Sequence, residues 1–276
     1  MLCKQKQYFM KTLSKLFIVT LLLSATFIQA QTTWRAVYQF KEIQTEADKK
    51  KQDSLVKARP EMASISKQIR EYLSNLTYYL DFNKNESVYK EEEKLENQKF
   101  GAGNVVIEIG NNEEILYKNN KDKEYVRTSS MFDGAYRIVD SLPNYQWKIT
   151  KETKQIGNYL VIKAVGVEEI KDKKGKIKKQ EIIAWFTPQI PAGTGPKLYG
   201  GLPGLIMEIK IDNKIYLVKE VIVNPKKHNK IIKPEKGKAI NSSDFEKKQK
   251  AYIEKMKKMY KNNRSKKGSN SSIFTF

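Results

Sequence analysis

Apolar side chains at every second position constrain the fold of this chain more than any other feature. From Thr77 onward, short runs with this period follow one another, separated by turn-like segments. A period of two places the apolar side chains on one face of a β-strand. The most regular runs are Val105–Ile109, Tyr159–Val167, Ile182–Phe186 and Leu205–Ile211. Consecutive strands joined by short turns predict a bent antiparallel sheet of about eight to ten strands, with one buried and one solvated face.

Two segments have the period of a helix instead. The first runs from Pro60 to Leu76 and opens on a proline, which the first helical turn tolerates. The second is capped by Ser243-Asp244 and runs to about Asn262, with apolar residues on one face and lysines on the rest. The charged segment Ala47–Lys57 is expected to be a loop or a loose helix. The fold class is therefore mainly β, with an N-terminal helix and a C-terminal amphipathic helix.

The first thirty residues have the pattern of a secretory signal peptide. Four lysines precede or open an apolar run from Leu16 to Ile28, and Ala30 supplies the small residue of a cleavage site. The run is shorter than the roughly 20 residues that a membrane-spanning helix needs. We therefore expect cleavage before Gln31, export to the periplasm or outer cell envelope, and no transmembrane span afterwards. An uncleaved N-terminal anchor is the alternative.

Charge divides the remainder of the chain. We expect a β-rich domain over residues 31–224 and a basic C-terminal extension over residues 225–276, made of the helix and a flexible tail. The net charge of the whole chain is +21, and from Lys210 to the end nineteen Lys and Arg stand against six Asp and Glu. Such a field attracts anionic partners, and for an exported protein these are anionic lipid or an acidic protein surface rather than nucleic acid. A solvated lysine-rich face without a partner is the alternative.

The stretch from Gly193 to Ile206 concentrates five of the fourteen glycines of the chain. Because glycine supplies positive φ and proline fixes φ at about −65°, this composition predicts a specific loop rather than a linker. Leu202–Leu205 has the pattern of a type II turn, in which Gly204 needs a positive φ. Backbone N–H groups together with Lys197 make the loop a candidate anion-binding site. A structural corner between two strands is the alternative.

Several motifs resemble those of the GLPGLI family of exported Bacteroidota proteins. Gly201–Ile206 spells G-L-P-G-L-I, and Trp147–Tyr159 is similar to the family's W-x-I-x-x-E-T-K-x-I-x-x-Y segment. Ala184–Thr187 continues the match as A-W-F-T, and the resemblance covers roughly Tyr78 to Val223. The family is largely uncharacterised, so the resemblance implies export and a β-rich domain but supplies no catalytic residue.

One departure from the family pattern limits what the resemblance implies. Family members commonly carry a cysteine in the strand that follows E-T-K-x-I, where this chain has Val161 or Ile162. Any thiol or metal role of that cysteine therefore does not transfer to this chain.

Few residues carry the chemistry that catalysis or metal binding needs. His228 is the one histidine of the chain, and the one cysteine, Cys3, lies in the signal segment. A closed zinc site and a histidine-based nucleophilic site are therefore not expected, and we assign no catalytic residue, no metal and no cofactor. Paired carboxylates stay possible because pairing is spatial, with Glu152 and Glu208 as candidates. A cross-strand ion pair is the alternative for Glu152.

These observations favour a non-enzymatic binding or assembly factor of the cell envelope. Its candidate binding residues surround the glycine-rich loop: Trp185, Gly195, Lys197, Tyr199, Gly201, Leu202, Pro203 and Gly204. A carboxylate-dependent hydrolase and a purely structural envelope protein are the alternatives. Two carboxylates together in a cleft would favour the hydrolase.

Overall fold

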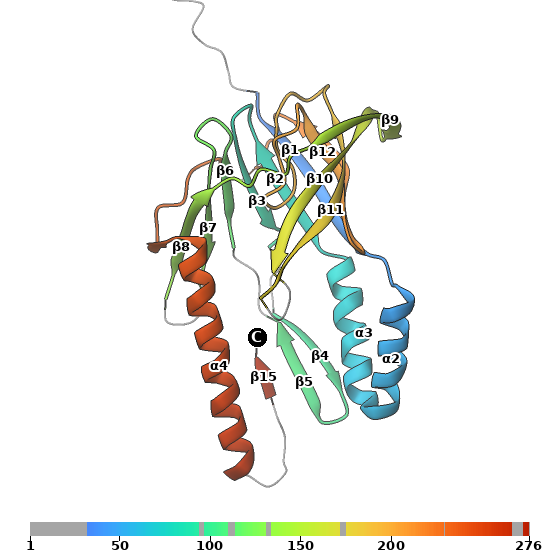
Figure 1. Cartoon of the computed structure of the whole chain (residues 1–276), viewed down its shortest axis with the longest axis vertical. Coiled ribbons are helices and arrows are strands. Elements are labelled where there is room, and N and C mark those ends of the chain that lie inside the picture. The colour runs from blue at the N-terminus through green and yellow to red at the C-terminus, as the bar shows by residue number, and fades with distance from the viewer. Residues whose placement is uncertain are drawn as a thin grey trace, which may run out of the picture. The chain divides into compact units, whose positions relative to one another are not determined.

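The computed structural model describes residues 32–93, 97–109, 114–130, 134–171, 175–228, 230–266 and 273–275. The expected signal peptide lies outside these ranges, as does most of the expected flexible tail. Among the described residues, twelve strands form one sheet in the order β14-β8-β7-β6-β3-β2-β1-β13-β12-β11-β10-β9 (Figure 1). Their bounds are β1 Trp34–Glu42, β2 Thr77–Phe82, β3 Glu86–Glu91, β6 Leu116–Asn119, β7 Glu124–Ser129, β8 Tyr136–Ser141, β9 Lys148–Ile156, β10 Tyr159–Lys171, β11 Ile177–Thr187, β12 Leu205–Ile211, β13 Lys214–Val223 and β14 Lys238–Ile240.

The predicted mainly β fold is confirmed, with one difference in its connectivity. Almost all neighbouring strands are antiparallel, and Asp212 and Asn213 form the expected two-residue turn between β12 and β13. The first strand, β1, lies between β2 and β13 and thus joins the two halves of the sheet. At one edge β14 pairs with β8 in parallel. Local alternation predicts that strands exist. It does not predict the pairing of β1 with β13 or of β14 with β8, because each of these pairs joins segments that are distant in sequence.

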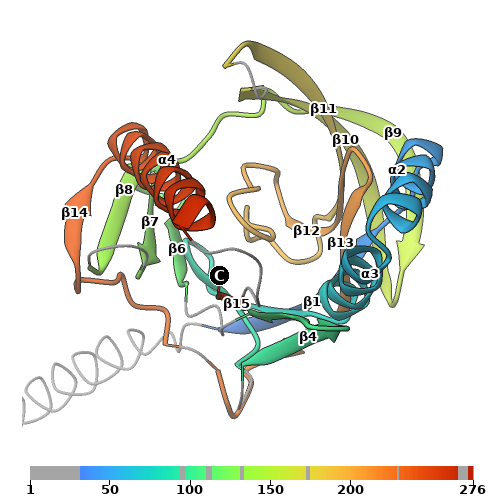
Figure 2. The same cartoon turned by 90° about the horizontal axis from the view of Figure 1, so that it is seen from below.

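The large sheet is curved. Its register shifts at Val37–Tyr38, at Ile162–Ala164 and at Trp185–Phe186, and such irregularities bend a strand and increase its twist. Seen from below, the strands curve around the segment that joins β11 to β12 (Figure 2). The concave face carries the main core, whose most buried large side chains include Tyr38, Leu80, Phe82, Phe186 and Ile209.

Two helices follow β1. The segment expected to be a loop or a loose helix is the α-helix α2, Glu46–Ala58. Thr45 and Asp48 form a capping box at its start, which satisfies N–H groups that a helix otherwise leaves without partners. The helix predicted from Pro60 is α3, Pro60–Ser74.

α3 packs on a small separate sheet. Its buried Ile65 joins Phe100 and Ile107 in a second apolar cluster. Phe100 lies on β4, Gln98–Ala102, and Ile107 lies on β5, Val105–Ile109, which pairs with β4 in antiparallel fashion. A third strand, β15, Ile273–Thr275, pairs with β5 in parallel. The strand predicted at Val105–Ile109 therefore exists but lies outside the large sheet.

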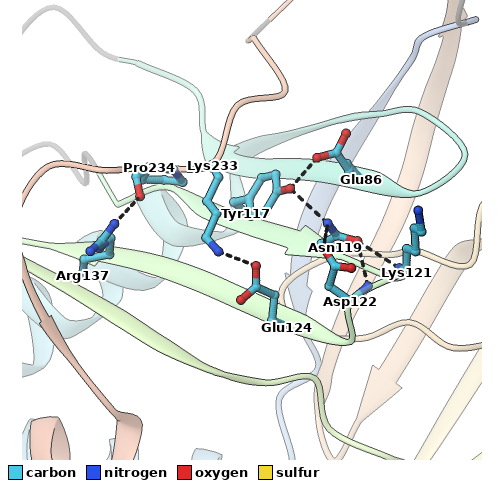
Figure 3. A network of polar contacts seen from close by, with 9 residues as sticks. All are labelled: Glu86, Tyr117, Asn119, Lys121, Asp122, Glu124, Arg137, Lys233 and Pro234. Atoms are coloured by element: carbon cyan, nitrogen blue, oxygen red, sulfur yellow. Dashed lines mark hydrogen bonds and ion pairs between the residues drawn. The ribbon is translucent and has the colours of Figure 1, made fainter.

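The basic segment 225–237 crosses the outer face of the large sheet. Ile231 packs on the buried cluster of Val88, Tyr117 and Val126. Lys233 Nζ lies 2.5 Å from a carboxylate oxygen of Glu124, and the Arg137 guanidinium donates to the carbonyl of Pro234 at 3.4 Å (Figure 3). The segment contacts strands β3, β6, β7 and β8 and leads into β14.

The C-terminal helix is α4, Ser242–Lys266, close to the predicted range. The Ser242 hydroxyl donates to the Asp140 carboxylate at the end of β8, and Phe245 is buried against Tyr136 and Arg127. Across the described ranges, no helix has both the length and the apolarity required to cross a membrane.

One ion pair links β1 and β2 on the outer face. The Arg35 guanidinium donates twice to the Asp81 carboxylate, at 2.7 and 2.8 Å, and its carbon lies 4.4 Å from the ring centroid of Tyr79. The Asp81 side chain is only 1% exposed. A bidentate pair of this kind compensates for the removal of both charges from water.

We expect Arg35→Met to lower the free energy of unfolding by about 3 kcal/mol or more, because it leaves the buried Asp81 carboxylate without its guanidinium. Urea unfolding measures the change. Lys49→Met, which breaks the exposed pair of Lys49 with Glu46, is the control and should cost less than about 1 kcal/mol. Equal effects of the two variants would contradict this assignment.

Candidate functional site

The glycine-rich segment between β11 and β12 folds back onto the concave face of the sheet. We call residues 188–204 the plug. Thr194 and Gly200 form an isolated antiparallel bridge, and Gly201 N–H donates to Gly193 O at 3.0 Å, so the middle of the plug is a small hairpin. Most of its apolar residues are buried, among them Ile190, Ala192, Tyr199 and Leu202. The plug therefore fills the space that the curved strands surround (Figure 2).

Side chains from several parts of the sheet bind the backbone of the plug. Lys118 Nζ on β6 donates to Gly195 O at 2.6 Å and to Tyr199 O at 3.1 Å. Trp147 Nε1 donates to Gly200 O at 2.9 Å. Further hydrogen bonds join Asn120 to Gly193 O, Ser87 to Thr194, and the Tyr38 hydroxyl to Ile206 O just after the plug. A buried carbonyl without a donor is costly, so these side chains make an irregular segment stable inside the molecule.

Lys118 is the least expected member of this group. Its side chain is 2% exposed, and burial lowers its pKa from the ordinary 10.5 to about 7. Lys118 is not among the binding residues predicted from the sequence. The signal that would have found it is its phase, since Lys118 lies two residues after the inward-facing Leu116 and thus on the same face of the strand.

Lys118 should give the folded protein a measurable pH dependence. Between its folded pKa of about 7 and the ordinary lysine pKa, the unfolded chain binds one more proton than the folded protein. The free energy of unfolding therefore rises with pH across this window, by up to about 1.4 kcal/mol per pH unit. Below the folded pKa both states are protonated, and the contribution stays at its minimum.

We expect Lys118→Met to remove this rise. Urea unfolding should be followed from about pH 7 to about pH 9.5, below the range in which tyrosines ionise in the unfolded chain. Lys210→Met, at an exposed position of β12, also removes one lysine charge. It should leave the rise of the free energy of unfolding with pH as it is in the wild type. If the free energy of unfolding changes with pH in the same way for the wild type and Lys118→Met, the lowered pKa of Lys118 in the folded protein is refuted.

The expected type II turn at Leu202–Leu205 is wrong. Gly204 has no positive φ, whereas Gly201 has a φ of 83°. Gly204 N–H donates to Leu202 O at 2.8 Å, which closes a three-residue turn around Pro203, and Leu205 N–H donates to Ile190 O instead. Gly204 is required for another reason: a Cβ there would lie 2.1 Å from the carbonyl oxygen of Thr187. The local pattern indicated a turn but not this approach of a second segment.

Gly204→Ala should therefore destabilise the fold by on the order of 2 kcal/mol or more, because the backbone of Thr187 has to move. Gly134→Ala is the matched control, since a Cβ at Gly134 meets no atom within 4 Å. Thermal or urea unfolding of both variants measures the difference. A Gly204→Ala variant as stable as the control would contradict the close approach.

The other candidate residues divide between the two faces of the sheet. Tyr199 and Leu202 are buried inside the plug, and Gly195 touches Ile206, where a Cβ would lie 2.8 Å away. Pro203, Gly201 and Lys197 are exposed. Trp185 lies on the outer face, between the buried Ala184 and Phe186 and opposite Glu208 of β12, and it is partly buried against the main core.

The two candidate carboxylates are both ion-paired. The Glu152 carboxylate lies 2.9 Å from Lys163 Nζ on the neighbouring strand, as the cross-strand alternative predicted. Glu208 lies 2.6 Å from Lys154 Nζ, which also sits 4.4 Å from the ring centroid of Trp185. Each acid thus has its own lysine partner on the outer face.

Lys197 occupies the tip of the plug in an unusual conformation. Its φ is 51°, a left-handed value that is uncommon and strained for a residue other than glycine. The residue is exposed to water, yet desolvation by surrounding protein lowers the pKa of its amine, against the opposing effect of Glu114 and Glu168.

Beneath Lys197 lies a group of aromatic rings that we call the aromatic floor: Phe40, Tyr78, Tyr89 and Tyr216. Lys197 Nζ is 4.9 Å from the ring centroid of Tyr216, whose pKa burial raises to about 12. Tyr216 packs on Phe40 and Tyr78, and Tyr78 stacks on Tyr89 with centroids 5.4 Å apart. The Tyr89 hydroxyl is buried and has no hydrogen-bond partner among the described residues.

Among the described residues, no three His, Cys, Asp and Glu side chains gather in a group able to hold a metal ion. His228, the one histidine, makes an interaction of its own in the segment that crosses the outer face.

One part of the chain matches a known family of proteins. Residues 171–208, which span β11 and the plug, match the sequence model of a family described as a protein of unknown function (Porph_ging). Two solved structures of PNGF-II, in C2 and P21 space groups, are similar at 14% identity and a TM-score of 0.49, covering 78% and 79% of this chain. The chain spans about a third of PNGF-II, 32% and 33% in the two structures. No curated protein matches.

Proposed function

We propose that this protein is a non-enzymatic binding or assembly factor of the cell envelope, whose ligand-contacting surface is the tip of the plug above the aromatic floor. The observation that carries the proposal is the backbone conformation of Lys197 together with the absence of a hydrogen-bond or ion-pair partner for its amine among the described residues. The backbone of Lys197 is held in a left-handed conformation, and the residue as a whole is exposed. Backbone strain of this kind clusters at binding and switch sites.

The surroundings of Lys197 suggest the chemistry of the ligand. The nearby carboxylates are engaged, because Glu114 lies 2.5 Å from the Arg127 guanidinium and Glu168 accepts a hydrogen bond from the Tyr199 hydroxyl at 3.0 Å. Lys197 therefore supplies a cation with unused donors at the exposed tip of the plug, beside the largely buried rings of the aromatic floor. This combination favours an anionic group attached to an apolar or aromatic body.

The candidate hydrolytic residues support binding over hydrolysis. A glycosidase acts through two carboxyl groups that face one substrate bond, whereas Glu152 and Glu208 are committed to different lysines on the outer face. The plug, with its carbonyls bound by Lys118 and Trp147, supports a scaffold that presents a surface.

Family membership and location belong to the same proposal. The segment matched by the family model, residues 171–208, contains the G-L-P-G-L-I hexapeptide at Gly201–Ile206. This overlap supports assignment of the chain to the GLPGLI family. The lysine-led apolar start of the sequence supports export to the periplasm or outer envelope.

The aromatic sulfonate 8-anilinonaphthalene-1-sulfonate is a suitable probe, because it combines an anion with an apolar ring system. We expect saturable binding at one site, with the affinity reduced about tenfold by Lys197→Met, since one direct charge contact is lost. Fluorescence titration measures it, and near-ultraviolet circular dichroism checks that the variant stays folded.

Lys210→Met is the matched control, because it removes the same charge on β12 at an exposed position away from the plug. It should leave the affinity unchanged. Non-saturable binding, or equal loss in both variants, would place the probe elsewhere and reject the site. Turnover of a defined substrate that Glu152→Gln or Glu208→Gln abolishes would reject the non-enzymatic function itself.

A further inference from the structure

Only the N-terminal part of α4 is shown docked on the sheet. Phe245 is 2% exposed and packs edge-on against Tyr136 with ring centroids 5.8 Å apart. Lys248 Nζ, one turn further along, reaches the Tyr136 hydroxyl at 3.4 Å. These contacts fix the first two turns of α4 beside β8, as the view from below also shows (Figure 2).

Beyond those turns, α4 exposes large apolar side chains on one side. Ile253, Met256 and Met259 are 42%, 46% and 49% exposed, and Tyr252 is 39% exposed. Tyr252, Met256 and Met259 are spaced by four and three residues, so they lie above one another on a single helix face, with Ile253 at its edge. Contiguous exposed apolar surface on a helix marks an interaction site.

The rest of the helix surface is basic. Lys247, Lys250, Lys255 and Lys258 each lie about 100° or more around the helix from Met256. Over its whole length, Ser242–Lys266, the sequence of α4 has nine Lys and Arg against three Asp and Glu. An apolar stripe inside a cationic surface is the pattern of a helix that lies in the plane of a membrane surface.

We infer that α4 docks this protein onto an anionic phospholipid surface. The apolar stripe enters the boundary between headgroups and acyl chains, and the lysines on either side contact anionic headgroups. Charge decides the occupant: a second copy of the same helix would bring its lysines against these lysines, whereas an anionic bilayer is complementary to them. This surface is separate from the plug tip, so the inference goes beyond the proposed ligand site.

Flotation of the full chain with vesicles tests the inference. The protein should float with vesicles that contain phosphatidylglycerol in a phosphatidylcholine background at low salt. Binding should fall at least about tenfold with phosphatidylcholine alone, and steeply at high salt, because headgroup attraction is screened. Binding that is indifferent to lipid charge and to salt would overturn the inference.

Two pairs of variants assign the binding to α4. Met256→Gln with Met259→Gln removes the stripe and keeps good helix formers, and Lys250→Glu with Lys258→Glu reverses charge beside it. Each pair should reduce vesicle binding at least about tenfold. The matched controls are Ile177→Gln, at an exposed apolar position of β11, and Lys210→Glu with Lys214→Glu at the β12–β13 hairpin, and these should bind as the wild type does.

The same variants distinguish other occupants of the stripe. A wild-type dimer in light scattering that Met256→Gln with Met259→Gln converts to monomer would show that a second copy covers the stripe, and would overturn the inference. Vesicle binding retained in both α4 pairs would overturn it as well. The sulfonate probe should bind the α4 variants unchanged, so failure of the membrane inference leaves the plug site standing, and the reverse holds for Lys197→Met.

Discussion

The hydrogen bonds from the curved strands to the plug are the interaction on which the rest of the structure depends. A sheet that bends this far has a concave side to fill, and this chain fills it with an irregular backbone segment. Such a segment brings polar N–H and C=O groups into the interior, where each one left without a partner costs free energy. Lys118 on β6, Asn120 just after β6 and Trp147 just before β9 supply those partners. The plug and the curvature therefore stabilise each other.

Local patterns in the sequence predicted the elements better than their partners. Alternation indicated most strands, Pro60 marked the start of α3, and the spacing of Phe245, Tyr252, Met256 and Met259 indicated α4. Pairing of β1 with β13 depends on residues almost two hundred positions apart, which no local pattern encodes. The same holds for Gly204, whose requirement comes from Thr187 in another segment. The segment that forms α2 has no apolar stripe, so the sequence did not clearly predict a helix there. The helix forms because a capping box starts it and its charged residues are good helix formers.

The candidate site was predicted in part. Glycine density located the plug, and Lys197 emerged as its cation, but Trp185 belongs to the opposite face. Lys118 was missed although it shares the strand face of Leu116, because the strand pairing is what shows that this face points inward. Tyr89 was missed because it is one tyrosine among fifteen. The lysines of this chain also differ in their surroundings. Lys154, Lys163 and Lys233 are paired with acids of the sheet, whereas the lysines of α4 surround an exposed apolar stripe.

The central position of β1 has a consequence for how the chain reaches this structure. The first described strand has partners on both sides, and one of them, β13, begins only at Lys214. The sheet cannot close until nearly the whole chain is available, and contacts of such long sequence separation form slowly because loop-closure entropy is lost first. The order of synthesis therefore leaves β1 without one of its two neighbours until the last third of the chain is being made.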